Sequence, residues 1–92
     1  MVIPKGELDI ATVEAVRAEA EQREPGENLV VDLREVDFLD TSGIAFAIDV
    51  FRASTDGGDF ELRILRAPPH VQRVFDIAGL EGVLPFEDAT DD

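Results

Sequence analysis

The stretch Asp37-Phe38-Leu39-Asp40-Thr41-Ser42-Gly43-Ile44 decides how this chain folds, because a strand pattern gives way there to a helix pattern. The preceding run from Leu29 to Leu33 is almost entirely apolar, which is typical of a strand covered on both faces. After Gly43 the apolar residues follow helical spacing to about Thr55. Two adjacent hydroxyls therefore lie at a predicted helix N-terminus, whose free N–H groups attract anions, phosphate included. These hydroxyls could cap the helix, or one of them could carry a phosphate.

Length and charge restrict the possible functions. The chain has 92 residues, which predicts one domain over residues 1–92 with a solvated acidic tail at 87–92. Its formal net charge of -13 repels nucleic acid and anionic membranes, and favours a basic protein partner or simply solubility. It contains no cysteine, and no apolar run is long enough for a signal peptide or a membrane span, so we expect a cytoplasmic protein that inserts into no membrane.

Strand and helix patterns alternate along the chain. Short apolar segments at Met1–Ile3 and Val83–Phe86 flank an amphipathic helix at Thr12–Gln22, an alternating strand at Phe60–Leu65 and a helix that opens at Pro69. A glycine at position 79 suits the left-handed residue that ends this last helix. The pattern predicts an α/β fold: a mixed, largely parallel sheet of about four strands with covering helices and right-handed crossovers.

The helix after Gly43 has apolar residues on two sides. One stripe faces the sheet, and the other must be covered by a neighbouring helix or by a partner. The first stripe contains Ile44, Ala47, Ile48 and Phe51, and the second contains Phe46, Val50 and Ala53. If a partner covers the second stripe, Phe46 and Val50 are part of a recognition surface beside the hydroxyl pair.

Three segments together resemble a known family. Asp40–Ile44, preceded by Val31–Leu33 and Val36–Leu39, is similar to the central motif of STAS domains of the anti-sigma-factor antagonist type. Gly6–Asp9 resembles the early Gly-Glu-Leu-Asp of that family, and Pro69–Leu80 resembles its Pro-x-Val-x-Arg-x-Phe-x-x-x-Gly-Leu segment. The matches occur in the family's order and cover nearly the whole chain.

The resemblance implies a phosphorylation switch. In the family, the hydroxyl residue directly after the Asp is phosphorylated by a partner that is both a serine/threonine kinase and an anti-sigma factor. The unmodified antagonist binds this partner, and the phosphorylated form releases it. By position the acceptor is Thr41, where the family usually has Ser, with Ser42 as the fallback. The residues expected at the motif and the partner surface are Asp37, Asp40, Thr41, Ser42, Gly43, Phe46 and Val50.

The chain also departs from the family pattern. We expect a first strand shorter than usual, and we expect no C-terminal helix after the last strand, where the family usually has one. The Leu-Gly-Val that usually follows the motif glycine is Ile44-Ala45-Phe46 here, which places a bulky side chain close to the expected interface.

We predict no enzymatic activity, no cofactor and no metal site for the chain itself. His70 is the only histidine and has no cysteine to join it as a ligand, so a metal site is not expected. Asp37 and Asp40 could form a carboxylate pair or bind Mg²⁺, but Asp40 is better explained as a residue that caps or orders the loop. The chain has no nucleophile–histidine arrangement and no phosphate-binding loop, so ATP and Mg²⁺ would come with the partner.

Two other functions remain open at this point. The chain could be a STAS accessory subunit of a lipid-transport ABC system that binds the ATPase through the same helix face. It could also be a scaffold in a multi-STAS signalling assembly. The Thr41-Ser42 pair, together with the segment containing Arg73 and Phe75, favours the antagonist.

Overall fold

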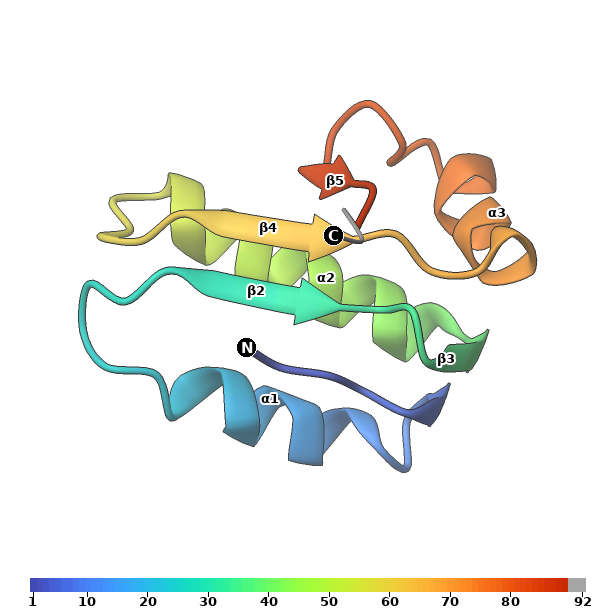
Figure 1. Ribbon diagram of the computed structural model, residues 1–92, viewed down its shortest axis with the longest axis horizontal. Helices are drawn as coiled ribbons and strands as arrows, with labels where there is room; N and C mark the ends of the chain where they lie inside the picture. The colour runs from blue at the N-terminus through green and yellow to red at the C-terminus, as the bar shows by residue number, and fades with distance from the viewer. Residues whose placement is uncertain (90–92) are drawn as a thin grey trace.

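A three-stranded parallel sheet forms one layer of the molecule (Figure 1). The computed structural model describes residues 1–89 of the chain. The strands are β2 (Leu29–Asp32), β4 (Leu62–Leu65) and β5 (Phe86–Glu87), in the order β2-β4-β5. The N-terminal segment extends this sheet through a parallel bridge between Val2 and Val31. Every strand pairing in the described residues is parallel, which confirms the predicted α/β fold with parallel strands, although these strands form two sheets and not one mixed sheet of about four strands.

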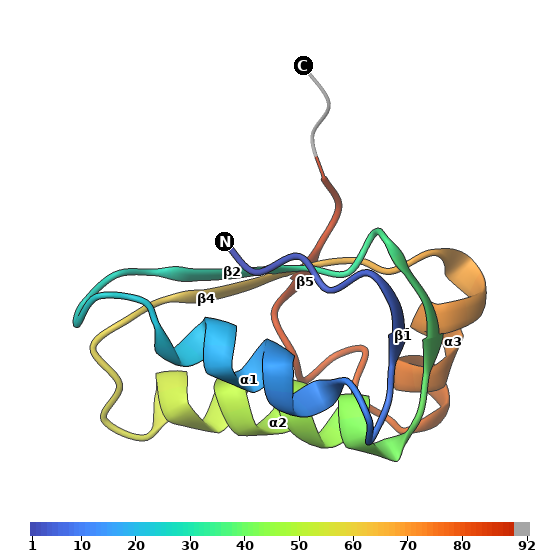
Figure 2. The same ribbon diagram turned by 90° about the horizontal axis from the view of Figure 1, so that it is seen from below.

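A second, two-stranded sheet lies at one end of the first. Strand β1 (Gly6–Leu8) pairs in parallel with β3 (Val36–Leu39), and Figure 2 shows both strands beside α3 (Pro69–Ile77). We did not predict β3 from the sequence, because it is short, its apolar residues do not alternate, and its partner is distant in the chain. The β3 strand leads directly into the central helix.

Two helices lie side by side on one face of the three-stranded sheet (Figure 2). They are α1 (Val13–Glu21) and α2 (Thr41–Thr55), and Arg17 of α1 forms a 2.9 Å ion pair with Asp49 of α2. Helix α1 begins at a turn in which the Asp9 carboxylate accepts hydrogen bonds from the backbone N–H groups of Ala11 and Thr12. Asp9 is therefore the acid that orders this helix start.

Phe46 lies in the hydrophobic core, so our expectation that a partner contacts it is wrong. Its side chain is only 1% exposed, because α2 is covered by the sheet on one side and by α1 on the other. Val50 is half-buried at the same boundary, and only Ala53 of the second stripe is exposed. The other large side chains that are almost completely buried are Leu8, Val31, Leu33, Val36, Ile64, Val71 and Phe75.

The C-terminal part of α3 ends as the sequence predicts. Gly79 has a φ of 78°, its N–H donates to the Asp76 carbonyl at 3.0 Å, and the Leu80 N–H donates to the Phe75 carbonyl at 2.9 Å. The chain then returns to the sheet, where the Phe75 and Phe86 rings pack edge to face with their centroids 5.0 Å apart. The turn thus directs β5 onto β4.

The last strand lies further along the chain than the sequence pattern suggests. Glu87 belongs to β5 and is paired with Arg63, so it is not part of a solvated tail. Asp88 forms a 3.2 Å ion pair with Arg66. The final part of the predicted tail, residues 90–92, lies outside the described residues.

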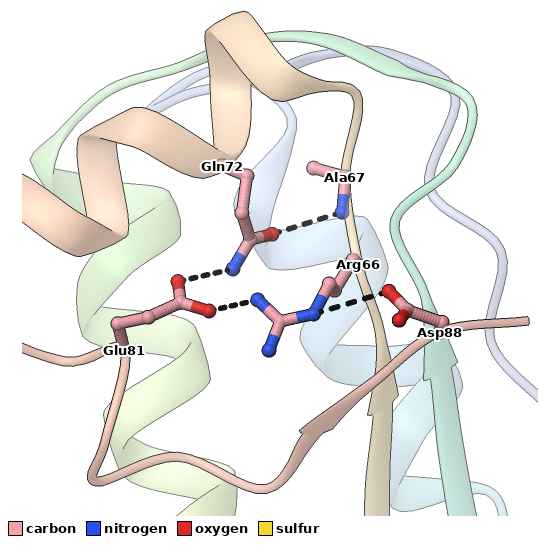
Figure 3. A network of polar contacts seen from close by, with 5 residues as sticks. All are labelled: Arg66, Ala67, Gln72, Glu81 and Asp88. Atoms are coloured by element: carbon pink, nitrogen blue, oxygen red, sulfur yellow. Dashed lines mark hydrogen bonds and ion pairs between the residues drawn. The ribbon is translucent and has the colours of Figure 1, made fainter.

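Gln72 connects α3 to the strand edge, as Figure 3 shows. Its amide oxygen accepts the Ala67 N–H at 3.0 Å, and its amide nitrogen donates to Glu81 at 3.0 Å. Glu81 is also paired with Arg66. Because each of these buried or half-buried polar groups has a partner, the network fixes α3 at the end of β4 without an unsatisfied group.

The burial of Phe46 generates a stability prediction. Phe46→Ala should lower the free energy of unfolding by about 3–5 kcal/mol, because it leaves a cavity between α2, α1 and the sheet. Phe38→Ala is the matched control, since the Phe38 side chain is 49% exposed, and it should cost far less. Urea denaturation of both variants measures the difference. Equal losses would contradict the placement of Phe46 in the core.

Asp32 generates a pH prediction. This residue is 3% exposed, and its carboxylate accepts hydrogen bonds from the Arg34 backbone N–H, Nε and Nη2 at 3.0, 3.0 and 2.8 Å. The side-chain bond from Arg34 lowers the pKa of Asp32 below its ordinary value of 3.8 despite burial. A lowered pKa stabilises the fold above the unfolded-state pKa, and this contribution disappears as the pH falls through the folded-state pKa.

Asp32→Asn should therefore be less stable than the parent chain at pH 7, and the gap should shrink as the pH falls below about 3.8. Urea denaturation of both proteins across this range, at constant ionic strength, measures the gap. A gap that stays constant with pH would show that the Asp32 charge contributes nothing.

Candidate functional site

The N-terminus of α2 is fixed by Asp40. This residue has an extended backbone (φ -113°, ψ -169°), and its carboxylate accepts the Ser42 N–H at 2.8 Å. Its carbonyl accepts the N–H groups of Gly43 and Ile44 at 3.1 and 3.2 Å, and its own N–H donates to the Leu8 carbonyl at 3.4 Å. The first turn of α2 is thus capped and also connected to β1.

Gly43 allows α2 to lie directly against the small sheet. A Cβ at this position would lie 2.3 Å from Leu39 Cδ1 and 3.0 Å from the Leu8 carbonyl oxygen, which is too close for any side chain without movement. Gly43 is buried, so it positions the helix and offers no surface to a partner.

The two hydroxyl residues differ in accessibility. Thr41 is exposed and Ser42 is half-buried. Within residues 1–89, neither hydroxyl forms a hydrogen bond, since the capping side chain is Asp40. The interpretation of the hydroxyls as helix caps is therefore wrong, and Thr41 is a solvent-exposed residue whose hydroxyl has no hydrogen-bond partner in residues 1–89.

A β-bulge in the small sheet changes which side chains of β3 face outward. Gly6 lies opposite Val36, but Glu7 lies opposite Phe38, so Asp37 is an extra residue in β3. The insertion breaks the alternation of faces, and both Asp37 and Phe38 are exposed while Leu39 is buried. Sequence reasoning missed Phe38, because β3 was not predicted and the bulge depends on pairing with β1, which is distant in the chain.

The surroundings of Thr41 are acidic. Asp37 is exposed on β3, and the described residues offer its carboxylate no ion pair. Its carbonyl oxygen lies 3.0 Å from His70 Nε2, which acts as the donor and connects α3 to β3. The structure thus brings Asp37, Asp40, Thr41 and Ser42 to one end of the molecule, whereas Phe46 and Val50 lie further along α2.

Neither a metal centre nor a membrane span is found in the described residues. Residues 1–89 contain no group of three or more His, Asp or Glu side chains placed to hold a metal ion. In the same part of the chain, no helix has the length and apolar character needed to cross a bilayer.

The chain belongs to the STAS domain family. A family model described as "Mlab, STAS domain" matches residues 5–85. An anti-sigma F factor antagonist of Paenibacillus polymyxa is 33% identical over 86 residues, which cover 90% of this chain and 73% of that protein. An anti-sigma-B factor antagonist of Staphylococcus aureus (strain NCTC 8325 / PS 47) is 30% identical over 88 residues, which cover 94% of this chain and 81% of that protein.

The fold is also similar to a solved antagonist structure. The anti-sigma factor antagonist SpoIIAA in its unphosphorylated form superposes with a TM-score of 0.72 and 26% identity, covering 97% of this chain and 77% of that one. The sequence resemblance to STAS domains of this type is therefore confirmed.

The Asp40 cap generates a testable prediction. Asp40→Ala should lower the free energy of unfolding by about 1 kcal/mol, because the Ser42 N–H loses its acceptor. Asp40→Asn is the control and should retain most of the stability, since Asn is an equally good N-cap. Thermal denaturation compares the two variants, and an Asn variant as unstable as the Ala variant would contradict the capping role.

Proposed function

We propose that this chain is an anti-sigma factor antagonist that binds an anti-sigma factor with serine/threonine kinase activity and is released when Thr41 is phosphorylated. The observation that carries the proposal is the exposed Thr41 hydroxyl, free of hydrogen bonds within residues 1–89, directly after the Asp40 cap. The two named antagonist relatives and the antagonist fold support the same role. The chain itself is a binding protein and not an enzyme, and the partner supplies ATP and Mg²⁺.

Thr41 is a better acceptor than Ser42. A kinase must reach the hydroxyl from solvent, and only Thr41 is exposed. The backbone N–H of Ser42 is also bonded to the Asp40 carboxylate, which keeps Ser42 within the capped turn.

The proposed switch acts through charge at the interface. A phosphate adds about -1.5 to -2 charges at neutral pH. The helix N-terminus tolerates this charge, so the fold is retained. A partner packed over Thr41 would instead have to desolvate the phosphate beside Asp37 and Asp40, which weakens binding. Before modification, the net charge of -13 attracts a basic partner surface.

Phe38 takes the place of Phe46 as the apolar contact of the proposed interface. It is three residues before Thr41, and the bulge turns it toward solvent. Aromatic side chains, Phe included, are enriched at protein interfaces relative to the rest of the surface. The proposed partner surface is therefore basic with an apolar pocket for Phe38.

Phosphorylation by a partner kinase tests the proposal directly. Incubation with ATP, Mg²⁺ and candidate kinases from the same cell should add one phosphate, detected by intact mass and mapped to Thr41. Thr41→Ala should abolish the modification, and Ser42→Ala is the control that should retain it. Modification of Ser42 alone, or of neither residue by any kinase that binds the chain, would contradict the assignment.

The STAS accessory subunit of a lipid-transport ABC system is a second candidate. The description of the matching family model favours it, since it names Mlab and not an antagonist. Pull-down with ATP and with ADP separates the two functions. A kinase complex should dissociate with ATP as Thr41 is modified, whereas a complex with a transporter ATPase should persist with both nucleotides and leave the chain unmodified.

A further inference from the structure

A cleft of about 490 Å³ lies between α1 and α2, at the end of α2 away from Thr41. Its volume is within the roughly 300–1,000 Å³ range of small-molecule sites. The apolar lining comes from both helices, from the first residue of β2 and from the segment before β4: Ala20, Leu29, Phe46, Val50, Ala53 and Phe60. Such a surface suits an alkyl chain or a similar apolar body.

One cation at the rim is held in place but not neutralised. The Arg23 guanidinium stacks on the Phe60 ring, with its central carbon 3.6 Å from the ring centroid. Its Nη1 donates to the carbonyls of Glu24 and Glu27 at 3.4 and 3.3 Å. Arg23 forms no ion pair with any carboxylate of residues 1–89. Within these residues its Nε and Nη2 therefore remain available to donate hydrogen bonds to a ligand.

The other charges of the rim are less suited to hold a ligand. Arg17 is already paired with Asp49 at 2.9 Å. Glu21 and Asp59 are exposed, so water screens them from a ligand. Arg23 is half-buried and fixed before a ligand arrives, and a fixed donor loses less entropy on binding. The guanidinium fork matches a carboxylate in particular.

We propose that this cleft binds a small amphipathic carboxylate, with its apolar body between α1 and α2 and its carboxylate on Arg23. The site is separate from the α2 N-terminus and does not depend on the proposed phosphorylation. Its ligand class follows from the apolar lining and from the one preorganised cation that the described residues place at the rim.

Titration with octanoate, followed by the backbone amide signals of the ¹⁵N-labelled protein, tests the proposal. Octanoate should give saturable shifts at the cleft residues, and Arg23→Gln should weaken binding by about tenfold or more, as expected for a charge-assisted hydrogen bond. Arg52→Gln is the matched control, because Arg52 is exposed on α2 but does not line the cleft. Ala53→Met should also weaken binding, since it fills the cleft from an exposed position.

Three results would overturn the proposal. The first is unchanged affinity in Arg23→Gln with a native amide spectrum. The second is binding of octanol or octylamine as tight as that of octanoate, which would show that the carboxylate does not contribute to binding. The third is an octanoate-insensitive dimer in sedimentation that Ala53→Met dissociates, which would show that a second copy occupies the cleft.

Discussion

The close approach of α2 to the small sheet at Gly43 is the constraint on which the rest of the structure depends. The space beside Gly43 is filled by Leu39 and by the Leu8 carbonyl, so a side chain at this position would require Leu39 to move aside and the Leu8 carbonyl to yield by a few tenths of an ångström. This contact fixes where α2 begins, and Asp40 then caps the first turn and connects it to β1. From that fixed start, α2 runs along the sheet and buries Phe46 beneath α1.

The same constraint explains how a small and highly acidic domain can present the proposed modification site. The first turn of α2 is held by backbone and carboxylate contacts that leave the Thr41 hydroxyl free in the described residues. A new charge on Thr41 therefore adds to an exposed helix N-terminus, where it disturbs little within the domain. The added charge would instead weaken the binding of a partner that packs over this helix end. A switch that controls partner binding needs this property.

Local patterns predicted those parts of the fold that depend on local chemistry. The positions of β2, α2 and β4 follow from apolar runs and helical spacing, and the end of α3 follows from Gly79. The Asp40–Gly43 turn and the exposure of its first hydroxyl also agree with the motif. The bulge at Asp37 depends instead on pairing with β1, a strand distant in the chain, so no local pattern revealed that Phe38 faces solvent. The prediction that a partner contacts Phe46 was wrong for a related reason. Helical periodicity shows two apolar stripes on α2, but it does not indicate whether α1 or a partner covers the second stripe.

Amide hydrogen exchange of the unmodified and the Thr41-phosphorylated protein tests the central claim most directly, namely that the proposed switch changes surface charge on a fixed helix end. We predict the same protection in β2, in β4 and in α2 beyond its first turn, with changes confined to the first turn of α2 and the end of β3. Loss of protection throughout α2 on phosphorylation would contradict this account and would show that the modification refolds the domain.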